Sequence, residues 1–247
     1  MNKLPQITLL FWIMKICATT LGETAGDLLS MTMNVGYAVS SVILISFFVV
    51  ILVMQLLSKK YYPVIYWAVI LATSTAGTTM SDFMNRSMGF GYALGSSVLI
   101  FLLIITLVVW KVTEKSLSVT NIKSFRGEIF YWTAILFSNT LGTSVGDFLA
   151  DNSGLGFSGG AILIGTLLLI IVIAHFFSKV SPVILFWLAF VLTRPFGATF
   201  GDLLTKTPDK GGLGFGTSGS SMVLFAVLFF LVIFTIVTKN KFTIKPL

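Results

Sequence analysis

The stretch FWIMKICATTLGETAGDLL, residues 11–29, begins as an apolar segment and ends with two acids, Glu23 and Asp27. Its tryptophan, Trp12, precedes Asp27 by 15 residues. The same spacing recurs three more times, and the four copies are Trp12 and Asp27, Trp67 and Asp82, Trp132 and Asp147, and Trp187 and Asp202. Successive copies lie 55, 65 and 55 residues apart. The chain therefore consists of four tandem repeats arranged as two pairs, and this repeat decides the fold.

Each repeat carries further residues at fixed distances from its aspartate. A glycine lies five residues before it and a small residue immediately before it; the pairs are Gly22 and Gly26, Gly77 and Ser81, Gly142 and Gly146, and Gly197 and Gly201. A hydroxyl lies three residues before it; these residues are Thr24, Thr79, Ser144 and Thr199. Because small residues four apart let helices approach closely, this part of each repeat is expected to pack against other helices.

A polar stretch and then a long apolar run follow each aspartate, so every repeat predicts two helical spans joined by a hairpin. The expected spans are approximately 6–27, 36–57, 63–82, 91–112, 127–147, 156–178, 182–202 and 214–238. They belong to repeats at about 6–60, 61–115, 126–180 and 181–240 of a single membrane domain, residues 1–247. Since each repeat holds an even number of spans, all four enter the membrane in the same direction.

The composition indicates an all-α integral membrane protein. Of the 247 residues 56% are hydrophobic and only 10% are charged, against about 25% charged in soluble domains; the mean hydropathy is +0.98. The net charge of +7 does not indicate nucleic-acid binding, because the basic residues flank apolar runs, where they orient helices in the bilayer. The single cysteine, Cys17, excludes an intrachain disulfide, and no cofactor is expected.

Basic residues predict the orientation in the membrane. Eleven lie on the side of the termini and the connections between repeats: Lys3, Lys59, Lys60, Lys111, Lys115, Lys123, Arg126, Lys179, Lys239, Lys241 and Lys245. Three lie on the hairpin side: Arg86, Lys206 and Lys210. This asymmetry predicts cytoplasmic termini and a cytoplasmic linker at about 111–128. The repeated tryptophans are expected to form an interfacial belt, and Lys15 to extend its amine to the interface.

Four tandem two-span units, each with a tryptophan and the repeated G-x3-[GS]-D pattern, resemble a bacterial family of multi-spanning membrane proteins built from a repeat of unknown function. The resemblance covers essentially the whole chain. It implies this architecture and a multi-pass location in a bacterial inner membrane, and it implies no activity.

The two spans of a repeat differ in composition. Odd-numbered spans carry glycine, threonine, serine and the acids, whereas even-numbered spans are nearly uninterrupted leucine, isoleucine, valine and phenylalanine. We therefore expect an inner ring of four odd spans inside four lipid-facing even spans. Such a ring directs its four aspartates toward one axis.

A charged side chain inside a span costs about 2.5–3.5 kcal/mol on insertion scales and usually faces an interior. Carboxylates and hydroxyls suit hard cations such as Mn²⁺, Mg²⁺ or Ca²⁺. Glu23 lies four residues before Asp27 and thus on the same helix face. The candidate metal or proton ligands are Glu23, Asp27, Asp82, Asp147 and Asp202, and the four hydroxyl residues named above are candidate supports. The alternative is that the aspartates only cap the hairpins.

Eight residues before each aspartate the repeats diverge: Thr19, Ser74, Asn139 and Arg194. Asn139 and Arg194 are candidate supporting or gating residues. Arg194 is expected either to pair with Glu23 or an aspartate across the bundle, as a lock or a gate, or to reach the interface.

The leading hypothesis is a transporter of a divalent metal cation such as Mn²⁺, with export as one candidate direction and the lipid bilayer as its surroundings. The alternative is a non-catalytic membrane scaffold or sensor subunit. An intramembrane enzyme is the weakest of the three and is not expected, because the acid recurs in four similar contexts and HExxH and GxSxG motifs are absent.

Overall fold

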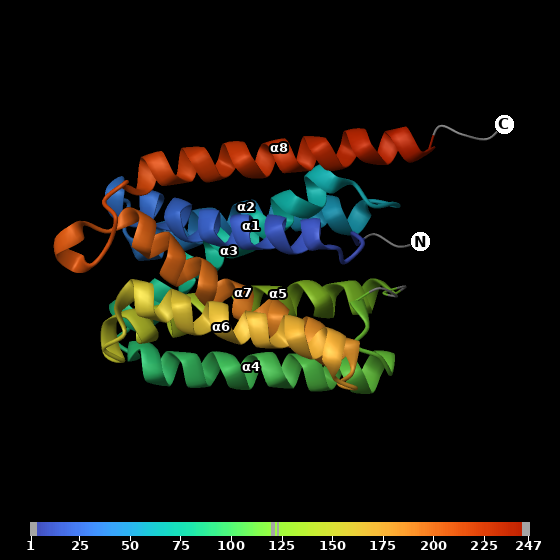
Figure 1. Ribbon diagram of the computed structural model, residues 1–247, viewed down its shortest axis with the longest axis horizontal. Helices are drawn as coiled ribbons and strands as arrows, with labels where there is room; N and C mark the ends of the chain where they lie inside the picture. Colours follow the sequence, from blue (N-terminus) through green and yellow to red (C-terminus); the bar gives the residue numbers. More distant parts are fainter. Residues whose placement is uncertain (1–3, 120–121, 123, 244–247) are drawn as a thin grey trace.

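The computed structural model describes residues 4–119, 122 and 124–243, and within these residues it is entirely helical, with eight α-helices and no strand. The helices are α1 (Leu9–Asp27), α2 (Tyr37–Leu57), α3 (Pro63–Asp82), α4 (Gly91–Glu114), α5 (Phe125–Asp147), α6 (Gly156–Phe177), α7 (Pro182–Thr205) and α8 (Thr217–Thr243). Two helices per repeat confirm the predicted helical hairpins (Figure 1). Lys3, Lys123 and Lys245, used above for orientation, lie outside the described residues.

The odd-numbered helices form a closed inner ring. In ring order, α1 packs on α3, α3 on α5, α5 on α7, and α7 returns to α1. Each even-numbered helix packs on the outside of the next repeat's inner helix: α2 on α3, α4 on α5, α6 on α7, and α8 on α1. The hairpins lie together at one end of the bundle, at the left of Figure 1, which we call the hairpin end. The opposite end, with connections 58–62 and 178–181, is the connection end. The predicted inner and outer sets of helices are confirmed.

Glycines bring the inner helices into backbone contact. The glycine five residues before each aspartate leaves no room for a Cβ, because that atom would collide with the next inner helix. The collisions pair Gly22 with Ser74, Gly77 with Asn139, Gly142 with Arg194, and Gly197 with Thr19. The same contact thus recurs four times, and its last copy joins the fourth repeat to the first. This contact is what closes the ring.

The chain remains helical beyond the repeated aspartates. A π-helical turn follows α1, α3 and α5 directly: η1 (Leu28–Thr32), η2 (Phe83–Ser87) and η4 (Phe148–Asn152). The carboxylates of Asp27, Asp82 and Asp147 do not cap these turns, and α7 continues three residues past Asp202 to Thr205. The 3₁₀ turn η5 (Pro208–Lys210) then belongs to the longer fourth hairpin. The hairpin-capping alternative therefore has no support in this geometry.

The outer helices present an apolar surface. Among the described residues, α2, α4, α6, α7 and residues 217–238 of α8 are long and apolar enough to cross a membrane by length and composition. The other inner helices, α1, α3 and α5, are less apolar because they carry the threonines, serines and acids that face other helices. Large side chains such as Phe101, Phe176 and Phe230 are exposed on the outer helices.

Three of the four repeated tryptophans do not lie in the predicted belt, whereas Trp12 is partly exposed. Trp67, Trp132 and Trp187 are buried, and they pack edge-on or tilted against neighbouring aromatic rings such as Tyr66 and Tyr131. The prediction was wrong because it used depth in the bilayer alone. The inner helices α3, α5 and α7 are surrounded by other helices at their ends too, so their tryptophans face protein.

Candidate functional site

Every fourth residue of each inner helix is buried, which defines an axial stripe of five residues per helix. Residues four apart share a helix face, so each stripe follows one side of its helix. The stripes are Phe11, Lys15, Thr19, Glu23 and Asp27 on α1; Tyr66, Ile70, Ser74, Thr78 and Asp82 on α3; Tyr131, Ile135, Asn139, Thr143 and Asp147 on α5; and Phe186, Phe190, Arg194, Ala198 and Asp202 on α7. They form five layers, aromatic at the connection end and acidic at the hairpin end.

The two layers nearest the connection end are mainly apolar. The hydroxyls of Tyr66 and Tyr131 lie 2.8 Å apart and share a hydrogen bond. One layer further, Lys15 is fully buried, with its Nζ 3.9 Å from the centroid of the Phe190 ring and 3.4 Å from Asn139 Oδ1. The expectation that Lys15 reaches the interface was wrong, because α1 turns this face toward the ring interior. Cation–π contact with Phe190 is one of its two stabilising contacts.

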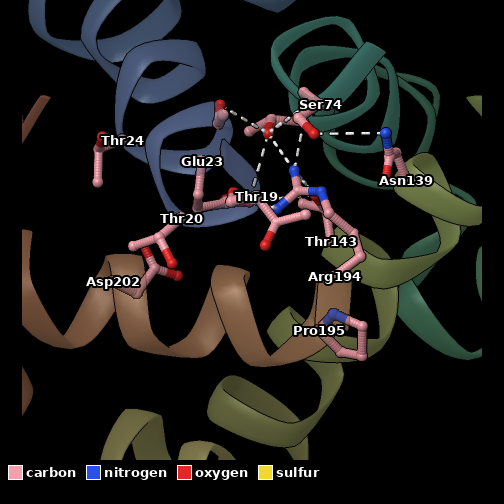
Figure 2. A network of polar contacts seen from close by, with 12 residues as sticks. Thr19, Thr20, Glu23, Thr24, Ser74, Asn139, Thr143, Arg194, Pro195 and Asp202 are labelled. Atoms are coloured by element: carbon pink, nitrogen blue, oxygen red, sulfur yellow. Dashed lines mark hydrogen bonds and ion pairs between the residues drawn. The ribbon is translucent and has the colours of Figure 1, made fainter. Parts of the chain in front are cut away.

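Arg194 joins all four inner helices in the middle of the stripe (Figure 2). It forms an ion pair with Glu23 Oε2 of α1 at 2.9 Å. It also donates to Thr19 O of α1 at 3.2 Å, Ser74 O of α3 at 3.2 Å and Thr143 Oγ1 of α5 at 2.7 Å. Of the two alternatives above, the structure shows the pairing with Glu23. A buried charge requires such a partner, because desolvation of an unpaired charge is strongly unfavourable.

Glu23 lies in a layer that sequence reasoning did not single out. The residues four before each aspartate are Glu23, Thr78, Thr143 and Ala198. Hydroxyls of Thr78 and Thr143 donate to Glu23 Oε2 at 3.3 and 3.1 Å. The i, i+4 spacing between Glu23 and Asp27 is the sequence signal that identifies this layer.

The hydroxyls three residues before each aspartate have other partners. Thr24 accepts from Ser221 Oγ of α8 at 2.8 Å, and the Ser144 hydroxyl lies 2.9 Å from Ser96 Oγ of α4. Thr79 and Thr199 donate to carbonyls of their own helices. These four residues thus connect inner to outer helices or stabilise their own helix.

The four aspartates are bridged in two pairs. Arg86 of η2 contacts Asp82 Oδ1 through Nε at 3.0 Å and Asp147 Oδ2 through a terminal nitrogen at 3.3 Å. Lys206, just after α7, places Nζ 2.6 Å from Asp27 Oδ2 and 3.1 Å from Asp202 Oδ1.

Both bridging residues were treated above only as orientation signals. Each lies four residues after the aspartate of its repeat, and 120 residues separate them, as they separate the two halves of the chain. Burial by itself lowers the pKa of Lys206. The carboxylates of Asp202 and Asp27 raise the pKa by a larger amount, so the net shift is upward and the amine stays charged.

Three of the five carboxylates could share one ion. One ligand oxygen from each of Glu23, Asp147 and Asp202 lies within 4.8 Å of the others, and all three residues are buried. Oxygen ligands of a hard cation lie about 2.0–2.6 Å from it, so oxygens of one coordination shell can be this far apart. We call these residues the carboxylate triad. Asp27 and Asp82 complete the acidic layer beside it.

The charges of the site do not balance. Counted as ionised, five carboxylates face three cations, Arg86, Arg194 and Lys206, which leaves a formal excess of two negative charges. Lys15 lies three layers away from the aspartates and contacts Asn139 and Phe190 instead. Excess buried charge is unfavourable unless protons or a bound cation neutralise it.

Fold and site together define a class: an all-helical, membrane-type protein in which four tandem hairpins close into a ring around a buried carboxylate cluster. The family described as Repeat of Unknown Function (DUF347) matches residues 10–61, 65–116, 130–181 and 185–241. The chain belongs to this family, and the four matched segments coincide with the four helical hairpins. Comparison with curated proteins and with solved structures found no match.

Proposed function

We propose that the chain is an integral membrane protein that transports a divalent metal cation, with Mn²⁺ as the representative ion. Apolar outer helices support the membrane location. The basic residues at the connection end support cytoplasmic termini, in a bacterial inner membrane as the family resemblance implies. The hairpin end then faces outward.

The observation that carries the proposal is the pair of uncompensated negative charges beside the carboxylate triad. One divalent cation, or two protons, neutralises that charge. Carboxylate and hydroxyl oxygens favour hard cations over copper or zinc. Protons and the metal therefore compete for the same carboxylates, and exchange between them is the proposed source of coupling.

The layered axis supports transport rather than permanent binding. Polar layers continue from the triad through Thr78 and Thr143 to Thr19, Ser74 and Asn139 before the apolar layers begin. The aromatic layer closes the connection end. A cation in the triad would therefore exchange with the hairpin side in this conformation. Crossing requires the ring interior around the buried Arg194 and Lys15 to rearrange and the aromatic layer to open.

One observation favours the alternative of a non-catalytic scaffold or sensor subunit. Each triad carboxylate already has an internal cation partner: Arg194 for Glu23, Arg86 for Asp147 and Lys206 for Asp202. Such pairs also occur where the only role is to hold helices together.

The test is Mn²⁺ flux into vesicles reconstituted with the full chain. Asp147→Asn and Asp202→Asn each remove one triad charge with little change in shape. We expect flux to fall at least about tenfold, because substitution of residues that only support metal ligands already causes losses of about that size. Asp209→Asn is the matched control, because Asp209 is exposed in the fourth hairpin. Circular dichroism checks that all variants fold. Unchanged flux in both triad variants, or no flux in the unmodified protein, contradicts the proposal.

A further inference from the structure

The three cations that face the carboxylate triad differ in accessibility. The side chain of Arg194 is 0% exposed, whereas those of Arg86 and Lys206 are 33% and 20% exposed. Arg86 and Lys206 lie at the hairpin end, where they cover buried aspartates. A cation approaching from that end meets these two side chains before it meets the triad.

Arg194 cannot leave without breaking the ring interior. Its guanidinium bonds to groups on α1, α3 and α5 while its backbone belongs to α7. Displacing it would leave buried backbone carbonyls and hydroxyls without donors, which is unfavourable because buried polar groups need hydrogen-bond partners. Arg194 is therefore a fixed charge of the site.

Arg86, by contrast, already borders a second position outside the acidic layer. Its guanidinium carbon lies 5.9 Å from the ring centroid of Tyr37 and 5.7 Å from that of Tyr92. It also donates to Tyr37 Oη at 3.3 Å, and Tyr92 donates to Asp151 at 3.2 Å. Aromatic faces stabilise a guanidinium, so these two half-buried rings can hold Arg86 when it releases a carboxylate.

Lys206 is the equivalent residue in the other half of the chain. It follows the last residue of α7 and so belongs to the fourth hairpin. Repeats one and three carry Met31 and Asp151 at this position, so each half supplies one cation. Arg86 spans α3 and α5, and Lys206 spans α7 and α1. Each bridge joins the aspartate of its own repeat to that of the next repeat in the ring.

We propose that Arg86 and Lys206 are the gate at the hairpin end: two tethered cations that hold the aspartates in pairs until a divalent cation binds and releases them. The inference rests on the proposed function and adds how its site opens. Once both side chains have moved away, five carboxylates face only Arg194, which favours a divalent ion in the triad. Return of the two side chains then expels the ion toward the hairpin side.

The test measures acylation of lysine amines by a water-soluble reagent, residue by residue, by mass spectrometry of the purified full chain. Lys206 is compared with and without Mn²⁺, and Lys210 of the same hairpin is the internal control. Without metal, the state in which Lys206 has left the aspartates is expected to hold at most about 10% of the molecules. Saturating Mn²⁺ should therefore raise acylation of Lys206 about tenfold or more and leave acylation of Lys210 unchanged. A parallel sample at matched ionic strength in NaCl separates release by the bound ion from screening of the ion pairs.

A second measurement keeps the result interpretable. Mn²⁺ binding is followed independently as a rise in the melting temperature of the unmodified chain. If Mn²⁺ stabilises the protein but Lys206 acylation stays constant or falls, the gate is wrong while the proposed cation site stands. If Mn²⁺ neither stabilises the protein nor changes labelling, the proposed function fails, and the gate fails with it. If NaCl alone reproduces the labelling, release is due to screening and the gate is also wrong.

Discussion

The inner and outer helices of one repeat make opposite use of the same helical geometry. On α5, polar residues such as Ser138, Asn139 and Thr143 are buried against other helices, whereas α6 buries only small or apolar residues, Gly160, Ala161 and Ile164. The inner helices therefore depend on specific close contacts, and the outer helices need only an apolar surface of suitable length. We expect substitutions to be costly in the inner ring and mild outside it, and three predictions test this difference.

The largest effect is expected at Arg194. Arg194→Met leaves Glu23 buried without its charge partner, and removing one member of a buried pair costs about 3–5 kcal/mol. The measurement is the free energy of unfolding in detergent, followed by circular dichroism. The double variant Arg194→Met, Glu23→Gln removes the orphaned charge as well and should recover much of the loss. A single variant that loses less than about 1 kcal/mol would show that Glu23 is neutralised in another way.

An intermediate effect is expected where the inner helices touch. A Cβ at Gly22 would overlap Ser74 of α3, including its backbone, so Gly22→Ala forces two helices apart, at about 1–3 kcal/mol. Gly219→Ala on α8 is the control, because a Cβ there meets nothing within 4 Å. The control should gain up to about 1 kcal/mol from better helix propensity. Equal melting temperatures for the two variants would contradict the close packing of the ring.

The smallest effect is expected where an outer helix is attached to the ring. Ser221 of α8 donates to Thr24 of α1 at 2.8 Å, and both side chains are buried. Ser221→Ala removes this bond and should cost about 1 kcal/mol of unfolding free energy. Ser97→Ala is the comparison, since the exposed Ser97 only donates to Ala93 O of its own helix, and its cost should stay within about 0.5 kcal/mol. If the Ser97 variant loses as much as the Ser221 variant, the inner–outer contact is not what the experiment detects.

Much of the fold follows from the sequence because duplication repeats the evidence four times. The Trp-to-Asp spacing, the paired small residues and the apolar runs predict eight helices and distinguish inner from outer ones. The side chains that break the symmetry were harder to place. Lys15 and the tryptophans were assigned from their depth in the bilayer, but their environment depends on which neighbouring helices surround them.

The candidate site was predictable only in part. The repeated aspartates and Glu23 stand out as acids within apolar segments, and their convergence follows from ring symmetry. The roles of Arg86 and Lys206 do not, because a basic residue four positions after the aspartate occurs in only two repeats. One basic residue can bridge two aspartates only because the ring places the next repeat's carboxylate beside it.

The sequence by itself determined the repeat, the helices, the division into inner and outer sets and the position of the carboxylates along the axis. Only the tertiary structure decided which face of each inner helix points inward, and with it the choice of Thr78 and Thr143 over Thr79 and Ser144 as partners of Glu23. The physical reason is that neighbouring residues on a helix point in directions about 100° apart, so adjacent positions face different neighbours. The rotation of each inner helix is fixed by the glycine contacts between neighbouring helices, and the sequence does not reveal which residue each glycine meets.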